Sequence, residues 1–235
     1  MSEYSFLEDK NLLKIDSLKD LIINGGKEIG FNLIDSQVEK FIIYLSELKK
    51  WNKSINLTAI KDDKLIITRL FLESLTFLYC FRPEDTKNVL DIGTGAGFPG
   101  MPIKIIHPEI FFTLTEGSKK KVVFLKHICR QIKLSAIECL SERAEEMVRH
   151  EKYKRYYDVV LAKGVSDIKT LIKVSFPLLK SGSLFITQKG EDLEGELKDA
   201  ELELKKGNWR VKNIIEVNKP IFGRAFRLVV IQNLS

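Results

Sequence analysis

Three glycines at two-residue spacing are the residues of this chain best suited to holding a ligand. Gly93, Gly95 and Gly97 follow the largely apolar run NVLDI at 88–92, and a Phe-Pro pair comes directly after them. The run predicts a short buried strand, and the residues beyond the loop predict the start of a helix. Glycine is needed where backbone passes within contact distance of a ligand or takes a positive φ angle. We therefore expect a ligand on this loop, because a tight turn alone requires fewer glycines.

The spacing of the glycines alone does not identify that ligand. Gly95, Gly97 and Gly100 also satisfy GxGxxG, and Glu116 stands at the distance expected of an acidic residue that binds a ribose. A dinucleotide is therefore one candidate on spacing alone.

Two further features favour S-adenosylmethionine over a dinucleotide. Asp91 precedes the first glycine, and a carboxylate there suits a ligand with a cationic sulfonium and ammonium group better than a pyrophosphate. Pro99 and Pro102 stand where backbone amides would otherwise be free for a phosphate, and proline has no N–H to offer. The loop is therefore expected to hold a methyl donor.

Other candidate residues follow the later predicted strands. In an open parallel sheet the ligand lies across the carboxyl ends of the strands. Glu116 can accept hydrogen bonds from both ribose hydroxyls, Ala144 and Glu145 can flank an adenine ring, and Lys163 faces the place of methyl delivery.

The residues after the fourth predicted strand also restrict the acceptor. LAKGVS at 161–166 has neither the Asn/Asp-Pro-Pro-aromatic motif of exocyclic-amine methylation nor a cysteine nucleophile after a proline. The acceptor should therefore be nucleophilic already, and nitrogen 7 of guanine is such an atom. Catalysis would then consist of positioning and electrostatics.

The elements that must position these residues form an α/β fold. Helices are expected from Leu18 to a stop at Gly25 and Gly26, from about 36 to 51, and from about 62 to 81, and residues 1–16 are expected to be a variable extension. Seven strands are expected at 89–92, 110–114, 136–140, 157–162, 183–187, 210–217 and 227–231. The alternation of strands with helices predicts a mostly parallel sheet of the class I methyltransferase type. We divide the chain into an N-terminal extension and helical cap, 1–86, and a methyltransferase domain, 87–235.

Composition is that of a globular protein with a basic excess. Among 235 residues, 38 Lys and Arg outnumber 32 Asp and Glu, giving a net charge of +6 that permits a polyanionic partner. No apolar run is long enough to span a bilayer, and no secretory signal opens the chain, so we expect a cytoplasmic protein. Three cysteines without metal spacing predict free thiols and no metal. Two basic clusters, either solvated helix faces or RNA contacts, lie at 119–133 and 152–155.

Five segments together resemble the RsmG/GidB family of bacterial 16S ribosomal RNA methyltransferases, which form 7-methylguanosine with S-adenosylmethionine. The segments are DIGTGAGFPGMPI, NLTAI, ERAEE, GSKKKVVFLK and QKG, and the similarity extends from about Leu33 to Ile231. The resemblance implies that 16S rRNA or the small ribosomal subunit is the partner. Separately, we expect a monomer. With the strand-end residues above, the expected cofactor contacts are Asp91, Gly93, Thr94, Gly95, Gly97, Phe98, Glu116, Ala144, Glu145 and Lys163. The expected catalytic residues are Lys163, Asn56 and Arg143. The expected RNA contacts are Lys119, Lys120, Lys121, Lys126, Arg224 and Arg227.

The chain departs from the family pattern at three positions that bear on RNA contacts. Leu70 follows Arg69 where a histidine is common, Lys163 replaces an arginine, and Phe226 stands two residues before the LVVI strand where an arginine is expected. A methyltransferase for a small molecule or a protein, and an RNA-binding protein without activity, remain alternatives. The basic clusters favour RNA over the first alternative, and the complete donor motif disfavours the second.

Overall fold

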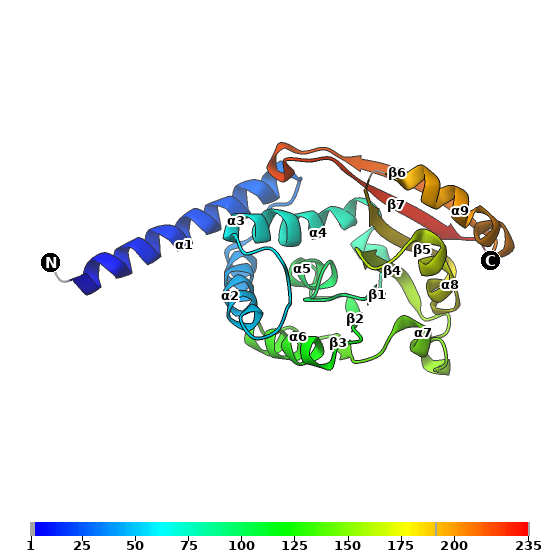
Figure 1. The fold of residues 1–235 in the computed structure, drawn as a ribbon, viewed down its shortest axis with the longest axis horizontal. Helices are drawn as coiled ribbons and strands as arrows, with labels where there is room; N and C mark the ends of the chain where they lie inside the picture. Colours follow the sequence, from blue (N-terminus) through cyan, green and yellow to red (C-terminus); the bar gives the residue numbers. More distant parts are fainter. Residues whose placement is uncertain (1–2, 191, 235) are drawn as a thin grey trace.

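The computed structural model describes residues 3–190 and 192–234 and contains a seven-stranded sheet in the order β3-β2-β1-β4-β5-β7-β6 (Figure 1). The strands are β1 (Asn88–Ile92), β2 (Phe111–Thr115), β3 (Ile137–Leu140), β4 (Tyr157–Lys163), β5 (Leu179–Lys189), β6 (Trp209–Val217) and β7 (Phe226–Asn233). β1 to β5 pair in parallel, whereas β7 is antiparallel to both β5 and β6. The predicted strands and the predicted sheet type are therefore confirmed.

Helices cover both faces of the sheet because its central strands are apolar on both sides. Val89 and Leu161 point into one hydrophobic cluster, and Leu90 and Val160, their neighbours in sequence, point into another. This alternation follows from the two-residue period of a strand. The first cluster is covered by α5 (Gly100–Ile106), α6 (Lys119–Gln131) and the N-terminal helices. The second is covered by α7 (Ala144–Met147), α8 (Ile168–Ser175) and α9 (Leu193–Lys206).

The first helix is longer than predicted. α1 runs from Glu3 to Glu28, includes part of the expected extension, and points away from the body of the protein at its amino end (Figure 1). Gly25 and Gly26 do not end it, so the predicted stop was wrong. A Cβ on Gly25 would collide with Leu72 and lie 3.3 Å from Ile221, so glycine permits close packing there. The turn comes instead at Gly30, whose φ is +84°.

The predicted helix at 62–81 is divided into four helical segments. After α2 (Asp35–Asn52), the chain forms α3 (Asp63–Ile66), a π-helical segment η1 (Ile67–Leu72), α4 (Glu73–Leu75) and a 3₁₀ turn η2 (Thr76–Tyr79). Further 3₁₀ turns are η3 (Pro83–Asp85), η4 (Glu151–Tyr153), η5 (Phe176–Leu178) and η6 (Pro220–Phe222). In the π segment the backbone N–H of Glu73 bonds to the carbonyl of Thr68, five residues earlier. Such segments are frequent at functional sites.

The cap and the sheet share one hydrophobic core. Phe41, Tyr44 and Phe71 of the cap belong to the same buried cluster as Val89 and Phe112 of the sheet. The proposed division at 86/87 therefore marks the change from helices to sheet, while the core continues across it. In the part of the chain described here, no helix combines the length and the hydropathy needed to cross a bilayer.

Candidate active site

A pocket of about 630 Å³ lies at the carboxyl ends of β1, β2, β3 and β4. Its walls include five residues predicted from the sequence, Gly93, Glu116, Arg143, Ala144 and Glu145. Val165, Ser166 and Thr170, which were not predicted as site residues, also line it. These residues meet because the carboxyl ends of parallel strands, and the loops that follow them, all lie at the same end of the sheet.

The three glycines of the loop have different roles. Gly93 and Gly95 both have positive φ angles, +62° and +61°, which favour glycine. A Cβ on Gly95 would meet no protein atom within 4 Å, so its free side opens onto space that a ligand can use. A Cβ on Gly97 would collide with the Tyr44 hydroxyl and lie 2.6 Å from Cγ of Met101. The explanation for Gly97 is therefore corrected: close packing inside the protein requires that glycine.

Asp91 lies beneath the loop and is fully buried. One carboxylate oxygen, Oδ2, accepts hydrogen bonds from the Thr94 hydroxyl at 2.6 Å and from the backbone N–H of Gly100 at 2.8 Å. Asp91 and Thr94 therefore fix the loop to the start of α5, a structural role that was not predicted, and the predicted contact of Asp91 with a cationic ligand stays a prediction. The other oxygen, Oδ1, is buried without a hydrogen-bond partner. Burial raises the pKa of Asp91 to about 7, mainly through loss of hydration.

Glu116 follows β2 and lines the pocket. Its Oε1 accepts a hydrogen bond from the backbone N–H of Ser118 at 2.8 Å, and its Oε2 lies 3.8 Å from Nζ of Lys121. The side chain is 13% exposed. This arrangement holds the carboxylate in one orientation and leaves it acceptor capacity for hydroxyl groups of a ligand.

Residues 143–145 complete the wall beyond β3. Ala144 is buried at the start of α7, whereas Arg143 and Glu145 are exposed beside it. The backbone N–H of Arg143 donates to the Glu146 carboxylate at 2.9 Å, which fixes the start of the helix. The pocket wall formed by Glu116, Ala144 and Glu145 suits the ribose and adenine of S-adenosylmethionine, whereas Asp91, Gly95 and Lys163 are not among the residues that line the pocket.

Phe98 is not in the pocket. Its ring is 8% exposed and stacks on Tyr44 at 5.5 Å between ring centroids. The Tyr44 hydroxyl donates a hydrogen bond to the carbonyl of Ala96. Phe98 therefore anchors the glycine loop to the cap, and its predicted direct contact with the cofactor is not supported by this geometry.

Lys163 ends β4 and belongs to a buried polar cluster. Its Nζ donates to the carbonyl oxygen of Arg69 at 2.8 Å and lies 3.4 Å from Oε2 of Glu73. Burial lowers the pKa of Lys163, and the Glu73 carboxylate opposes that change. Glu73 was not singled out from the sequence. The signal available was an acid within the apolar stripe of the helix predicted at 62–81.

The predicted RNA contacts do not share one environment. Lys119, Lys120 and Lys126 are exposed on α6, whereas Lys121 is partly buried near Glu116. The Nη2 atom of Arg224 donates to both carboxylate oxygens of Glu73, at 3.0 and 3.2 Å, although the side chain is 45% exposed. Arg227 is half-buried in β7, whose first residue is the buried Phe226.

Asn56 is exposed in the loop after α2, and the contacts described for this loop do not join it to the pocket. Its neighbour Asn52 organises the loop: Oδ1 accepts from the backbone N–H groups of Leu57 and Thr58 at 2.8 and 3.0 Å. The predicted catalytic role of Asn56 therefore stays a prediction.

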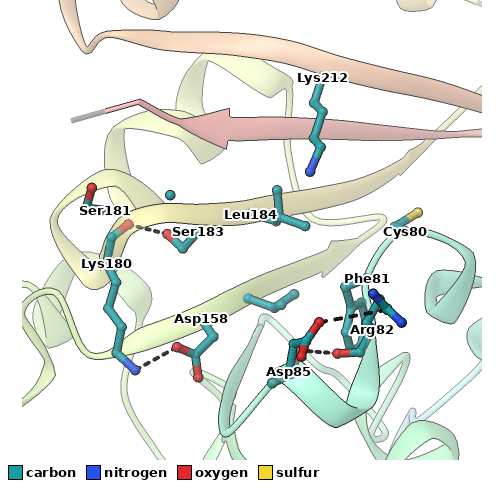
Figure 2. A pocket seen from close by; sticks show the side chains of 13 residues that line it. Cys80, Phe81, Arg82, Asp85, Asp158, Lys180, Ser181, Ser183, Leu184 and Lys212 are labelled. Carbon is teal, nitrogen blue, oxygen red and sulfur yellow. Dashed lines mark hydrogen bonds and ion pairs between the residues drawn. The ribbon is translucent and has the colours of Figure 1, made fainter.

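A second pocket of about 410 Å³ lies at the opposite end of the strands, where β4 and β5 begin (Figure 2). Asp158 pairs there with Lys180 at 2.6 Å and also accepts from the backbone N–H groups of Lys87 and Asn88, so its charge holds the strand starts together. Ligands of open parallel sheets bind at the carboxyl ends, which favours the first pocket. Within 3–190 and 192–234, no group of three or more His, Cys, Asp or Glu side chains could hold a metal ion.

Several solved structures share this fold at low sequence identity. TrmN from Thermus thermophilus aligns with a TM-score of 0.53 at 19% identity, covering 69% of this chain and 48% of that one. The [4+2]-cyclase SpnF aligns with a TM-score of 0.57 at 13% identity, covering 84% and 96%. At these identities the comparison establishes the fold alone.

Two relatives found by sequence comparison have higher identity to this chain than these structures do. The protein named ribosomal RNA small subunit methyltransferase G of Desulforamulus reducens is 37% identical over 221 residues, covering 93% of this chain and 92% of the relative. The protein of the same name from Clostridium kluyveri is 36% identical over 209 residues, covering 89% and 87%. The family model GidB, described as rRNA small subunit methyltransferase G, matches residues 37–224. The resemblance inferred from the five segments is thereby confirmed, and the chain belongs to the rRNA small subunit methyltransferase G family.

Proposed function

We propose that this protein transfers a methyl group from S-adenosylmethionine to nitrogen 7 of a guanosine in 16S ribosomal RNA. The observation that carries the proposal is that the pocket at Gly93 and Glu116 adjoins the end of β4 at Lys163. Both lie at the carboxyl ends of the parallel strands. Family membership supports the same reaction, because the relatives are named for the small-subunit RNA.

In this reaction the main role of the protein is to position the donor and the acceptor base. Bound S-adenosylmethionine supplies an electrophilic methyl group on a cationic sulfur. Nitrogen 7 attacks with its own lone pair, so the S–CH₃ bond breaks as the N–CH₃ bond forms, and no proton leaves the base. The positive charge passes from sulfur to the methylated guanine. The residues at the end of β4 carry neither the Asn/Asp-Pro-Pro-aromatic motif nor a nucleophilic cysteine after a proline, which suits an acceptor that is already nucleophilic.

In this proposal Lys163 orients the base. A protonated lysine has three N–H donors, and contacts to Arg69 and Glu73 account for two of them. The third is available for an acceptor such as O6 of guanine, which lies beside nitrogen 7 on the same edge of the base. Such a bond orients the base and leaves nitrogen 7 free.

Lysines on α6 are proposed to bind the RNA backbone. Three exposed lysines on α6 contribute phosphate contacts that carry no information about the target base. They are Lys119, Lys120 and Lys126. The enzyme acts as a monomer in the cytoplasm, where ribosomal RNA is its partner.

The test uses Lys163→Ala, with single-turnover methylation and filter binding of small-subunit RNA. The variant should lose more in turnover on saturating RNA than in RNA affinity, because Lys163 acts at the reacting end. Mapping of 7-methylguanosine in the RNA product identifies the acceptor atom. Absence of methylation by the wild-type protein, on both naked RNA and assembled subunits, would contradict the proposed function.

A further inference from the structure

Glu73 is the centre of the polar cluster beside the proposed transfer edge. Its side chain is 1% exposed, although a carboxylate is among the groups that are most costly to bury. Lys163 lies 3.4 Å from its Oε2, Arg224 donates to both of its oxygens, and Nε2 of Gln188 donates to Oε2 at 3.2 Å. The partners come from three separate places, which are the end of β4, the end of β5 and the loop before β7. Glu73 therefore ties together the elements that surround Lys163.

The backbone near Glu73 takes part in the same arrangement. The π segment η1 directly precedes Glu73, and the carbonyl of Arg69, which lies in this segment, accepts from Nζ of Lys163 at 2.8 Å. Lys163 is thus held between a carbonyl and a carboxylate that are four residues apart in one irregular helix. Nε of Arg69 is itself buried without a hydrogen-bond partner in this structure. π segments such as η1 are frequent at functional sites.

The Glu73 carboxylate affects the protonation of Lys163. Burial favours the neutral form of Lys163, and three charged groups face it: Glu73 from α4, Asp91 from β1 and Arg224 from the loop before β7. Glu73 and Asp91 favour the protonated form, whereas Arg224 disfavours it, and Glu73 is the strongest of the three. Without the Glu73 carboxylate, Lys163 would lose its proton at a lower pH and lose one of its two fixed contacts.

We propose that Glu73 is a positioning residue for methyl transfer, which holds the Lys163 ammonium group in the orientation that directs it at the acceptor base. This inference rests on the proposed function, since it assigns Glu73 a role through Lys163. The carboxylate itself is enclosed and need not touch the RNA or the donor.

The first experiment compares Glu73→Gln with the wild-type protein in single-turnover methylation of small-subunit RNA. The rate at saturating donor and RNA should fall by about 100-fold, as expected when a reacting geometry is misplaced by about 1 Å. Donor affinity by calorimetry and RNA affinity by filter binding should stay close to the wild-type values. Asp63→Asn is the matched control, because Asp63 is a largely buried acid of the same cap that pairs with Lys14 and Lys49. Its methylation rate should be unchanged.

The second experiment separates positioning from a purely structural role. The rate of Glu73→Gln should decline toward alkaline pH at a lower pH than that of the wild-type protein, because the pKa of Lys163 is no longer raised by the carboxylate. Adding Lys163→Arg should abolish this decline, since arginine stays protonated throughout the accessible range. A loss of stability alone would not produce a pH dependence that responds to the residue at 163.

The outcomes distinguish this inference from the proposed function. If the wild-type protein methylates RNA and Glu73→Gln does so equally fast, the inference is wrong while the function stands. If Glu73→Gln is slow but its pH profile matches the wild type, or the decline persists with Lys163→Arg, Glu73 does not act through Lys163. Glu73→Asp, which keeps the charge, covers the case in which the glutamine variant fails to fold. It should retain the wild-type pH profile, and a profile shifted to lower pH would refute the inference.

Discussion

Gly95→Val tests whether the open side of the glycine loop belongs to the donor. A Cβ at this position would meet no protein atom within 4 Å, so valine creates no clash inside the protein. The cost to folding comes from the backbone, whose φ of +61° a β-branched residue rarely adopts. That strain amounts to about 1–2 kcal/mol. For a chain of this size it lowers Tm by about 2–8 °C. Donor binding should nevertheless be abolished, because the valine methyl groups would occupy the space of the ligand.

The assay is calorimetric titration with S-adenosylmethionine, alongside a thermal melt of each protein. Gly182→Val is the matched control: Gly182 has a φ of +75° and open space around its Cβ position, but it lines the second pocket, at the amino-terminal ends of β4 and β5. It should show a similar fall in Tm with unchanged donor affinity. Gly97→Ala should show a larger fall in Tm, since the added methyl group lies 2.6 Å from Cγ of Met101.

Two results would refute this reasoning. Wild-type donor affinity in Gly95→Val would show that the ligand does not lie against this side of the loop. Loss of donor binding in Gly182→Val as well would show that backbone strain, rather than occupied space, explains the effect at Gly95.

Three further predictions concern the donor site and the basic helix. Glu116→Ala should weaken donor binding by about 1.5–3 kcal/mol, or about 10- to 150-fold, through loss of charge-assisted hydrogen bonds, and unchanged calorimetric affinity would contradict this. Burial raises the pKa of Asp91 to about 7, so Asp91 gains its negative charge as pH rises through that value. Affinity for the cationic donor should therefore increase between about pH 6 and 8 in calorimetry, and Asp91→Asn should remove the increase. Replacing three exposed lysines by alanine should reduce the salt slope of RNA binding by about one unit for each phosphate contact and leave donor binding unchanged, whereas an unchanged slope would mean that α6 is only a solvated face. The three are Lys119, Lys120 and Lys126.

The sheet could be predicted because its signals are local. Each strand is a short apolar run bounded by glycine, polar or charged residues, and the structure moves the predicted boundaries by only a few residues at most ends. The strand-end residues could be predicted for the same reason: a parallel sheet brings Glu116 and Ala144 to one edge whatever the details of packing. The longest difference is in β5, which begins at Leu179 rather than at Ser183.

The cap was harder to predict because its irregularities depend on distant contacts. Gly25 lies inside α1, where it allows Leu72 and Ile221 to approach, and neither contact can be inferred from the residues around it. The predicted helix at 62–81 has the apolar spacing of a regular helix. The π segment and the residue after it contact Lys163, which lies about 90 residues later in the sequence, and the residues around 62–81 do not reveal that contact.

The seven-stranded α/β sheet, the glycine loop and the place of Glu116, Glu145 and Lys163 after strands could all be inferred from residue type and spacing. The contacts that these and neighbouring residues make follow from the folded structure. Gly97 and Phe98 are needed for packing against Tyr44, Asp91 fixes the start of α5, and Glu73 holds Lys163. The physical reason is that residue type and spacing reflect the local backbone, whereas burial, pKa and free hydrogen-bonding capacity depend on side chains that folding brings together from distant parts of the chain.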